Sequence, residues 1–75
     1  MWKDYIITDE SILAGKPIIK GTRLSVDFIL DLLANSWSND EILGNYKQLT
    51  LEHIHACLKY ASQIIKEEKV VLTNQ

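Results

Sequence analysis

GKPIIKGTRLSV, from Gly15 to Val26, decides how the first third of this chain folds. Pro17 forces the residue before it into an extended conformation, and a glycine frees the backbone on either side. Ile18-Ile19 then reads as a short strand, and Gly21-Thr22 suits a two-residue hairpin loop with glycine first. We therefore predict a small β-hairpin over residues 16–24.

The same stretch concentrates positive charge. No Asp or Glu occurs from Ser11 to Val26, although the whole chain has a net charge of −2. The cations in this interval are Lys16, Lys20 and Arg23. A polyanion would meet the protein here. Lys16 and Lys20 are expected to face outward, whereas Arg23 is expected to brace the tight turn through carbonyls or acids.

Upstream, Tyr5–Ile7 reads as a short strand, and three helices are predicted downstream over about 26–35, 39–46 and 51–68. Ser25 is a candidate N-cap for the first helix, and Ser38-Asn39-Asp40-Glu41 has the capping-box pattern for the second. Thr50 is a candidate N-cap for the third helix.

On the third helix the apolar side is expected to hold Leu51, Ile54, Cys57, Leu58, Ala61, Ile64 and Ile65. The opposite side is expected to hold Glu52, Ala56, Lys59 and Gln63, with His53 and His55 near the edges.

A tail over 69–75 carries three apolar residues, Val70, Val71 and Leu72. It is predicted either to pair with the strand at Tyr5–Ile7 or to bind a partner. The 75 residues form one domain over 1–75, and so short a chain commonly gains stability from a partner. A homodimer or an obligate complex is therefore expected.

The single cysteine, Cys57, excludes an intrachain disulfide and indicates a reducing compartment. The sequence shows no signal peptide and no span of about 20 apolar residues. A soluble cytoplasmic protein with no membrane association is expected.

Sites for chemistry are poorly supported. Five residues separate Gly15 from Gly21, and Thr22 stands where a phosphate loop needs lysine. His53 and Cys57 lie one helical turn apart, but a zinc site needs three or four ligands. Asp27 and Asp31 are explained as a solvated helix face. No catalytic residue, metal or cofactor is expected, and the protein is not predicted to be an enzyme.

The last two helices are joined by a short turn at Lys47-Gln48-Leu49, which is typical of a helix-turn-helix. The fold class is therefore predicted as mainly α: a three-helix, homeodomain-like or winged helix-turn-helix bundle with a short N-terminal strand and a small hairpin. If the last helix reads DNA, the candidate contacts are Lys16, Lys20, Arg23, Lys47, Thr50, His53, His55 and Lys59. Glu52 opposes this interpretation because it presents an acid to phosphates.

GKPIIKGTRLSV, ILDLLANSWSNDEILGNYKQLT and EHIHACLKYA together resemble the small prokaryotic domain-of-unknown-function family 433. The resemblance implies an antitoxin-like protein that binds a PIN-like nuclease toxin from an adjacent gene and its own promoter DNA. It marks the hairpin residues Gly15 to Pro17 and Gly21 to Arg23, and then Trp37, Glu41, Ile42, Tyr46, Leu49 and Thr50. The chain departs from the family pattern at Lys47, where a proline is usual, and at Asn35-Ser36, near which a glycine is usual.

A second hypothesis is a small acidic protein-interaction module that does not bind nucleic acid. The isoelectric point of about 5.5 and the apolar tail favour it. The two functions are compatible, because one chain can bind both a protein and DNA.

Overall fold

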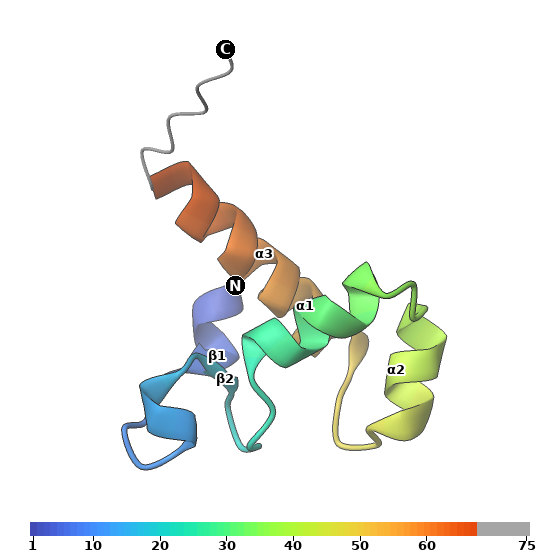
Figure 1. Ribbon diagram of the computed structural model, residues 1–75, viewed down its shortest axis with the longest axis horizontal. Helices are drawn as coiled ribbons and strands as arrows, with labels where there is room; N and C mark the ends of the chain where they lie inside the picture. Colours follow the sequence, from blue (N-terminus) through green and yellow to red (C-terminus); the bar gives the residue numbers. More distant parts are fainter. Residues whose placement is uncertain (68–75) are drawn as a thin grey trace.

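A computed structural model of the chain describes residues 1–67 (Figure 1). Three helices, α1, α2 and α3, follow a short two-stranded sheet, which confirms the predicted mainly helical class. Single turns of 3-10 helix, η1 and η2, flank the first strand. The bounds are η1 Trp2–Asp4, β1 Ile6–Ile7, η2 Leu13–Gly15, β2 Ile18–Ile19, α1 Val26–Ala34, α2 Asn39–Asn45 and α3 Leu51–Glu67. The tail, with Val70, Val71 and Leu72, lies outside the described residues.

The sheet pairs β2 with β1 in antiparallel register, Ile6 opposite Ile19 and Ile7 opposite Ile18. The return segment pairs as well, since the Ile19 N–H donates to the Leu24 carbonyl at 2.9 Å and Ile18 bridges to Ser25. β2 thus joins the N-terminal strand to the start of α1.

The predicted loop geometry was wrong by one residue. The Thr22 N–H donates to the Ile19 carbonyl at 3.0 Å, which makes Lys20 and Gly21 the two central turn residues. Gly21 has φ +83°, which side-chain-bearing residues rarely adopt, so glycine is required at the second central position. The Thr22 hydroxyl donates to the Ile19 carbonyl at 2.8 Å and accepts from the Leu24 N–H at 3.0 Å. These bonds hold the turn from inside.

Local capping sets where the helices begin. The Ser25 hydroxyl accepts from the Phe28 N–H at 3.2 Å at the head of α1. At α2 the capping box is complete: the Glu41 N–H donates to the Ser38 hydroxyl at 3.0 Å, and the Ser38 N–H donates to the Glu41 carboxylate at 2.7 Å. Both caps were predicted from sequence.

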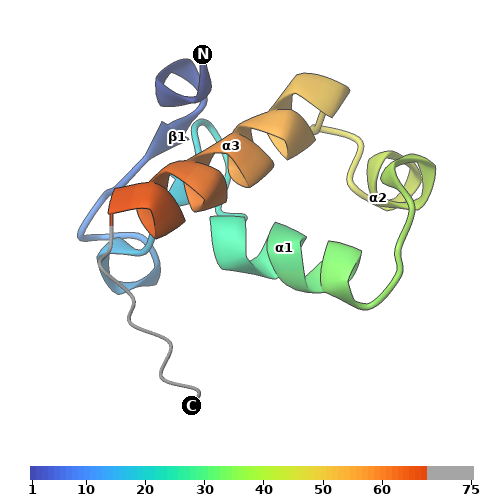
Figure 2. The same cartoon turned by 90° about the horizontal axis from the view of Figure 1, so that it is seen from above.

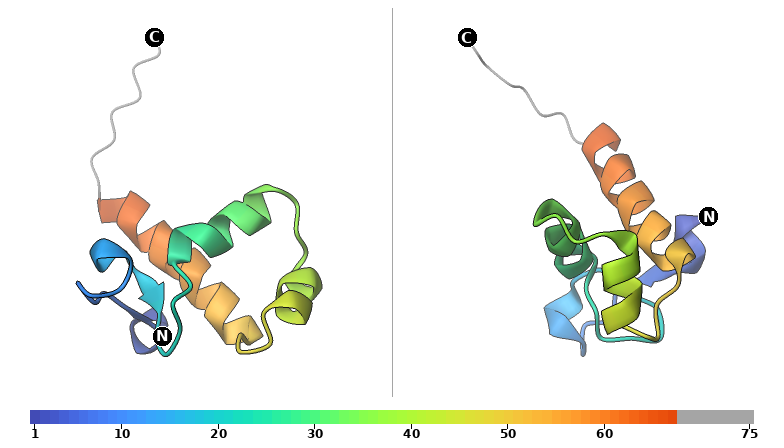
Figure 3. Two further views of the ribbon diagram at one scale, coloured as in Figure 1. Left: turned by 60° about the horizontal axis from the view of Figure 1, so that its bottom comes forward. Right: turned by 90° about the vertical axis from the view of Figure 1, so that its right-hand side faces the viewer.

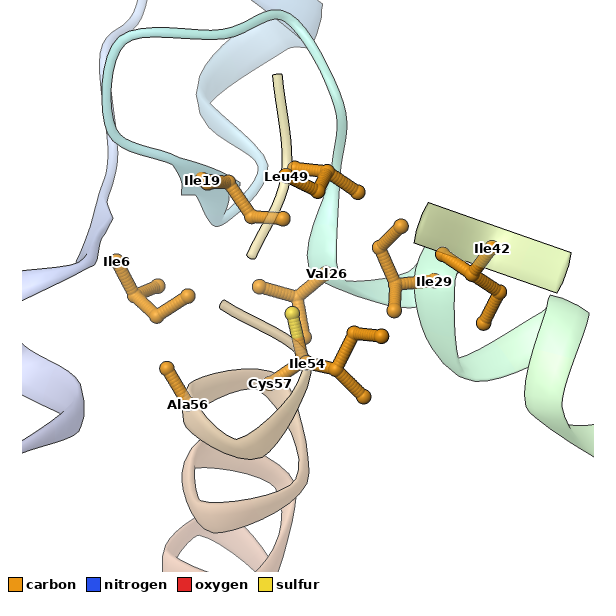
Figure 4. Packing of buried hydrophobic residues seen from close by; sticks show 9 residues of the cluster. All are labelled: Ile6, Ile19, Val26, Ile29, Ile42, Leu49, Ile54, Ala56 and Cys57. Atoms are coloured by element: carbon orange, nitrogen blue, oxygen red, sulfur yellow. The ribbon is translucent and has the colours of Figure 1, made fainter. Parts of the chain in front are cut away.

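The core is built from one isoleucine on each helix, Ile29, Ile42 and Ile54, all with no exposed surface. Figure 4 shows Ile29 beside Ile42, together with Ile19 from β2, Val26 from the start of α1 and Leu49 from the loop before α3. α3 contacts η1, β1, α1 and α2. Figure 2 shows α1 on one side of α3 and the N-terminal segment on another, so α3 is the element around which the others assemble.

Two predictions about α3 were wrong. Ala56 was assigned to the polar side but is buried, because η1 and β1 cover that side. The rings of Trp2 and Tyr60 meet edge to face there, with centroids 5.0 Å apart. Conversely, Leu51, Leu58, Ile64 and Ile65 were assigned to the buried side but are exposed. Within residues 1–67, no helix is long and apolar enough to cross a membrane.

Replacing Ile29 with alanine tests the core. Ile29→Ala is expected to lower the free energy of unfolding by about 2–5 kcal/mol, because it leaves a cavity where three helices meet. Ile7→Ala is the matched control, since Ile7 is 36% exposed, and should cost about 1 kcal/mol or less. Urea denaturation followed by circular dichroism measures both. Equal losses would contradict this assignment of the core.

Candidate interaction surfaces

Residues 16–24, called the opening loop below, are fixed at their start to α1 by a chain of polar contacts. The Lys16 ammonium pairs with the Asp27 carboxylate at 3.2 Å, and the Ser25 hydroxyl donates to the same carboxylate. The Val26 N–H also donates to the Pro17 carbonyl at 2.9 Å. Ser25 is therefore a donor to Asp27 and an acceptor for the helix terminus at once, and these contacts hold residues 16–17 on α1.

Arg23 does not brace the turn as expected, whereas Lys16 is exposed as expected and in addition pairs with Asp27. Lys16 makes the ion pair, whereas Arg23 is exposed and makes no hydrogen bond or ion pair with any residue from 1 to 67. The nearest influence of Arg23 is electrostatic: two hydrogen bonds from Ser11 lower the pKa of Asp9, and the charge of Arg23 lowers it slightly further. Lys20 is also exposed. Lys20 and Arg23 are thus the free cations of this loop among the described residues.

The predicted DNA contacts on the third helix occupy different surroundings. The Thr50 N–H donates to Nδ1 of His53 at 2.9 Å, so this ring nitrogen caps α3 instead of facing a ligand. The His53 ring is half-buried against Tyr5, with centroids 5.5 Å apart. His53 is therefore a structural residue in this position. Lys47, by contrast, is exposed on the loop between α2 and α3.

His55 and Lys59 lie on the other flank of α3, where they line a hollow of about 330 Å³ with Glu52, Ala56 and the N-terminal residues Met1, Trp2 and Tyr5. The N-terminal segment stands beside this face of α3 (Figure 3). A recognition helix needs its outward face free to enter a major groove. Lys16 is thus paired at the head of α1, Lys47 lies on the loop between α2 and α3, and Lys59 lines the hollow beside the N-terminal residues. The structure therefore does not bring these three candidate DNA contacts together.

An apolar groove was not anticipated from the sequence. It has a volume of about 320 Å³ and lies between α1 and the C-terminal half of α3, next to the loop. Its apolar lining comes from Pro17, Val26, Leu30, Tyr60, Ala61, Ile64 and Ile65, with Lys16 and Asp27 as the polar lining. The sequence feature that could have indicated this groove is the length of α3. The apolar side of α3 continues past the point where α1 can cover it.

Other groups offer little chemistry. Cys57 is fully buried, and burial raises the pKa of its thiol to about 11, so the thiol stays protonated at neutral pH. Among residues 1–67, no three His, Cys, Asp or Glu side chains lie close enough together to hold a metal ion.

The sequence profile of the DUF433 family, whose description is a protein of unknown function, matches residues 6–61. The chain belongs to the DUF433 family. A crystal structure of a DUF433 member protein from Anabaena variabilis ATCC 29413 superimposes with a TM-score of 0.79 at 25% sequence identity, over 87% of this chain. This chain spans 64% of the length of that protein. No curated protein matches the sequence. The family indicated by the hairpin motif is thus confirmed.

Changing Asp27 to asparagine tests the polar chain at the head of α1. The hydrogen bond from Ser25 is the largest influence on Asp27 and lowers the pKa of its carboxyl below 3.8; partial burial opposes this, and Lys16 adds a further lowering. Because the folded-state pKa is the lower one, the stabilisation is complete above about 3.8 and is lost as the pH falls through the folded value. Asp27→Asn should therefore lower Tm at pH 7, and the difference from wild type should shrink below pH 3.8.

Asp31→Asn is the matched control, because the Asp31 carboxylate lies on the same helix and makes no hydrogen bond or ion pair within residues 1–67. It should change Tm little at either pH. A Tm loss in Asp27→Asn that does not depend on pH would contradict the role assigned to the carboxylate.

Proposed function

We propose that this chain is an antitoxin-like module that acts by binding a partner protein and not by catalysis. The observation that carries the proposal is the apolar groove between α1 and the end of α3. Ile64 and Ile65 on its α3 wall are 36% and 67% exposed. Contiguous exposed apolar surface on a small protein commonly marks a site of protein association.

The groove favours a partner that inserts large apolar side chains. Its two charged lining residues, Lys16 and Asp27, already pair with each other. A polar ligand would find few hydrogen-bonding groups there. An aliphatic or aromatic anchor from another protein would replace water along Leu30, Ala61 and Ile64, and such anchors supply most of the binding energy in protein interfaces.

Charge supports a basic partner. Asp31 is exposed on α1 and makes no ion pair within residues 1–67, whereas Asp27 is paired with Lys16, and the whole chain carries a net charge of −2. A nuclease must present basic surface to its nucleic-acid substrate. The PIN-like toxin that the family resemblance implies would therefore complement this face. Binding near the toxin's basic surface would neutralise the toxin by blocking substrate access.

Promoter binding is a second candidate function, favoured by the exposed cations Lys20, Arg23 and Lys47. The outward face of α3 is less suitable for DNA, because Leu51 and Leu58 are exposed on it beside Glu52. We therefore place any DNA contact on the loop cations. Few cations are available, so the affinity would be modest and would fall steeply with salt.

Ile64→Lys tests partner binding. A charge placed on the groove wall should cost about 2 kcal/mol of binding free energy, or roughly 30-fold in Kd for the product of the adjacent gene. Ile7→Lys is the matched control, because Ile7 is an isoleucine of the same 36% exposure on β1, and it should bind normally. Isothermal titration calorimetry measures both. Wild-type affinity in Ile64→Lys would remove the groove from the interface.

A double change of Lys20 and Arg23 to glutamate tests promoter binding. Fluorescence anisotropy with the upstream promoter should show binding at low salt that weakens roughly tenfold in the double variant. Lys3→Glu, an exposed cation on η1, is the control and should leave the affinity unchanged. If wild-type protein does not bind DNA at low salt, with or without its protein partner, the DNA function is wrong and only the protein-binding function stands.

A further inference from the structure

A second apolar surface runs along α3, separate from most of the groove. Leu51, Leu58 and Ile65 recur at intervals of seven residues and are 41%, 46% and 67% exposed. Seven residues make nearly two helical turns, so these side chains form one line along the helix. We call Leu51, Leu58 and Ile65 the outer stripe. Only Ile65 also belongs to the groove.

The outer stripe has the flanks of a helix-pairing seam. Glu52, Lys59 and Lys66 each follow a stripe residue by one position, and all three are exposed. They therefore form a parallel row of charges beside the apolar line. His55 and Ser62 lie between the stripe residues on this face, and the small side chain of Ser62 leaves room for another helix to approach. An apolar line bordered by charges is the pattern with which helices associate in pairs.

We propose that the outer stripe binds α3 of a second copy of this chain in antiparallel orientation, with a two-fold axis at Leu58. Leu58 then meets Leu58 of the second copy, and Leu51 meets the second copy's Ile65 at each end. A two-fold interface must be self-complementary, and a line of three apolar residues centred on Leu58 meets that condition. The dimer would bury the most exposed leucines of the helix, which a 75-residue chain gains stability by covering.

Charge selects the antiparallel orientation. With the axis at Leu58, Glu52 of each copy lies beside Lys66 of the other, which gives two opposite-charge pairs. A parallel arrangement would place this row of charges on opposite sides of the seam in the two copies, so Glu52 and Lys66 would not meet and neither pair would form. In the antiparallel dimer, Lys59 of one chain lies near Lys59 of the other chain at the two-fold axis. The two like charges repel, so each long side chain must extend into solvent. Removing the charge of Lys59 should therefore strengthen the dimer.

Sedimentation equilibrium of the full chain tests the proposal. The wild type should be a reversible dimer, and Leu58→Lys should raise its dissociation constant by about 100-fold or more, because two charges would meet at the centre of the seam. Leu13→Lys is the matched control: Leu13 is also 46% exposed but lies on η2, and its change should leave the dimer intact. Circular dichroism of each variant checks that the helices remain folded.

A charge exchange tests the orientation. Glu52→Lys and Lys66→Glu should each weaken the dimer several-fold, and the double variant should recover wild-type affinity. Lys59→Gln should tighten the dimer. Recovery in the double variant cannot arise from a merely structural effect of either residue, whereas single variants without effect would overturn the antiparallel pairing.

Two results would overturn the dimer itself. One is a wild-type chain that stays monomeric up to roughly 1 mM, a concentration at which even a weak pair would associate. The other is a monomeric wild type whose Leu58→Lys variant fails to bind the product of the adjacent gene, which would assign the outer stripe to the protein partner. Ile64→Lys separates the two proposals, because it should weaken partner binding and leave the dimer unchanged.

Discussion

The mismatch in length between α3 and the elements that pack on it determines the surface of this protein. α3 has 17 residues and α1 has nine, so at 1.5 Å per residue α3 extends roughly 12 Å further. The buried residues of α3 all lie between Ile54 and Cys57, in its first half. Tyr60 still packs on Trp2, but further along the helix Ile64 and Ile65 are left exposed by residues 1–67, and Figure 1 shows the C-terminal end of α3 extending past α1. The exposed end of the groove and the Ile65 end of the outer stripe are both consequences of this mismatch.

The opening loop also shapes the groove, as part of its lining. Lys16, Asp27 and Ser25 tie the loop to the head of α1, which places Pro17 as one wall of the groove. Pro17 and Lys16 thus have structural roles here, as groove wall and as ion-pair partner of Asp27, and neither role involves a phosphate ligand. Lys20, Gly21 and Thr22 form a separate turn beyond the tie, and this turn exposes cations. The loop therefore combines a structural part and an exposed part.

The sequence predicted the elements well where the deciding interactions are local. Ser25, Ser38 and Glu41 act within four residues of their partners, and their caps were predicted. The position of Gly21 within its turn was misjudged because pairing of β2 with both β1 and Leu24 sets the register, and these contacts are not local. Burial of Ala56 depends on η1, more than 50 residues away in sequence, and periodicity within one helix carries no such information. The ion pair of Lys16 was missed for a similar reason, since Asp27 is 11 residues from Lys16.

Solvent exposure of methyl groups in α3 tests the central claim most directly: Ile64 and Ile65 near the end of this helix, which residues 1–67 leave exposed, form the surface that we propose a partner chain covers. A soluble paramagnetic agent can be added to methyl-labelled protein, first at low concentration alone and then in complex with the product of the adjacent gene. The account predicts that Ile64 and Ile65 methyl signals are strongly broadened in the isolated chain and protected in the complex, while Ile54 is protected in both. Protection of Ile64 and Ile65 in the isolated, dilute chain would contradict it.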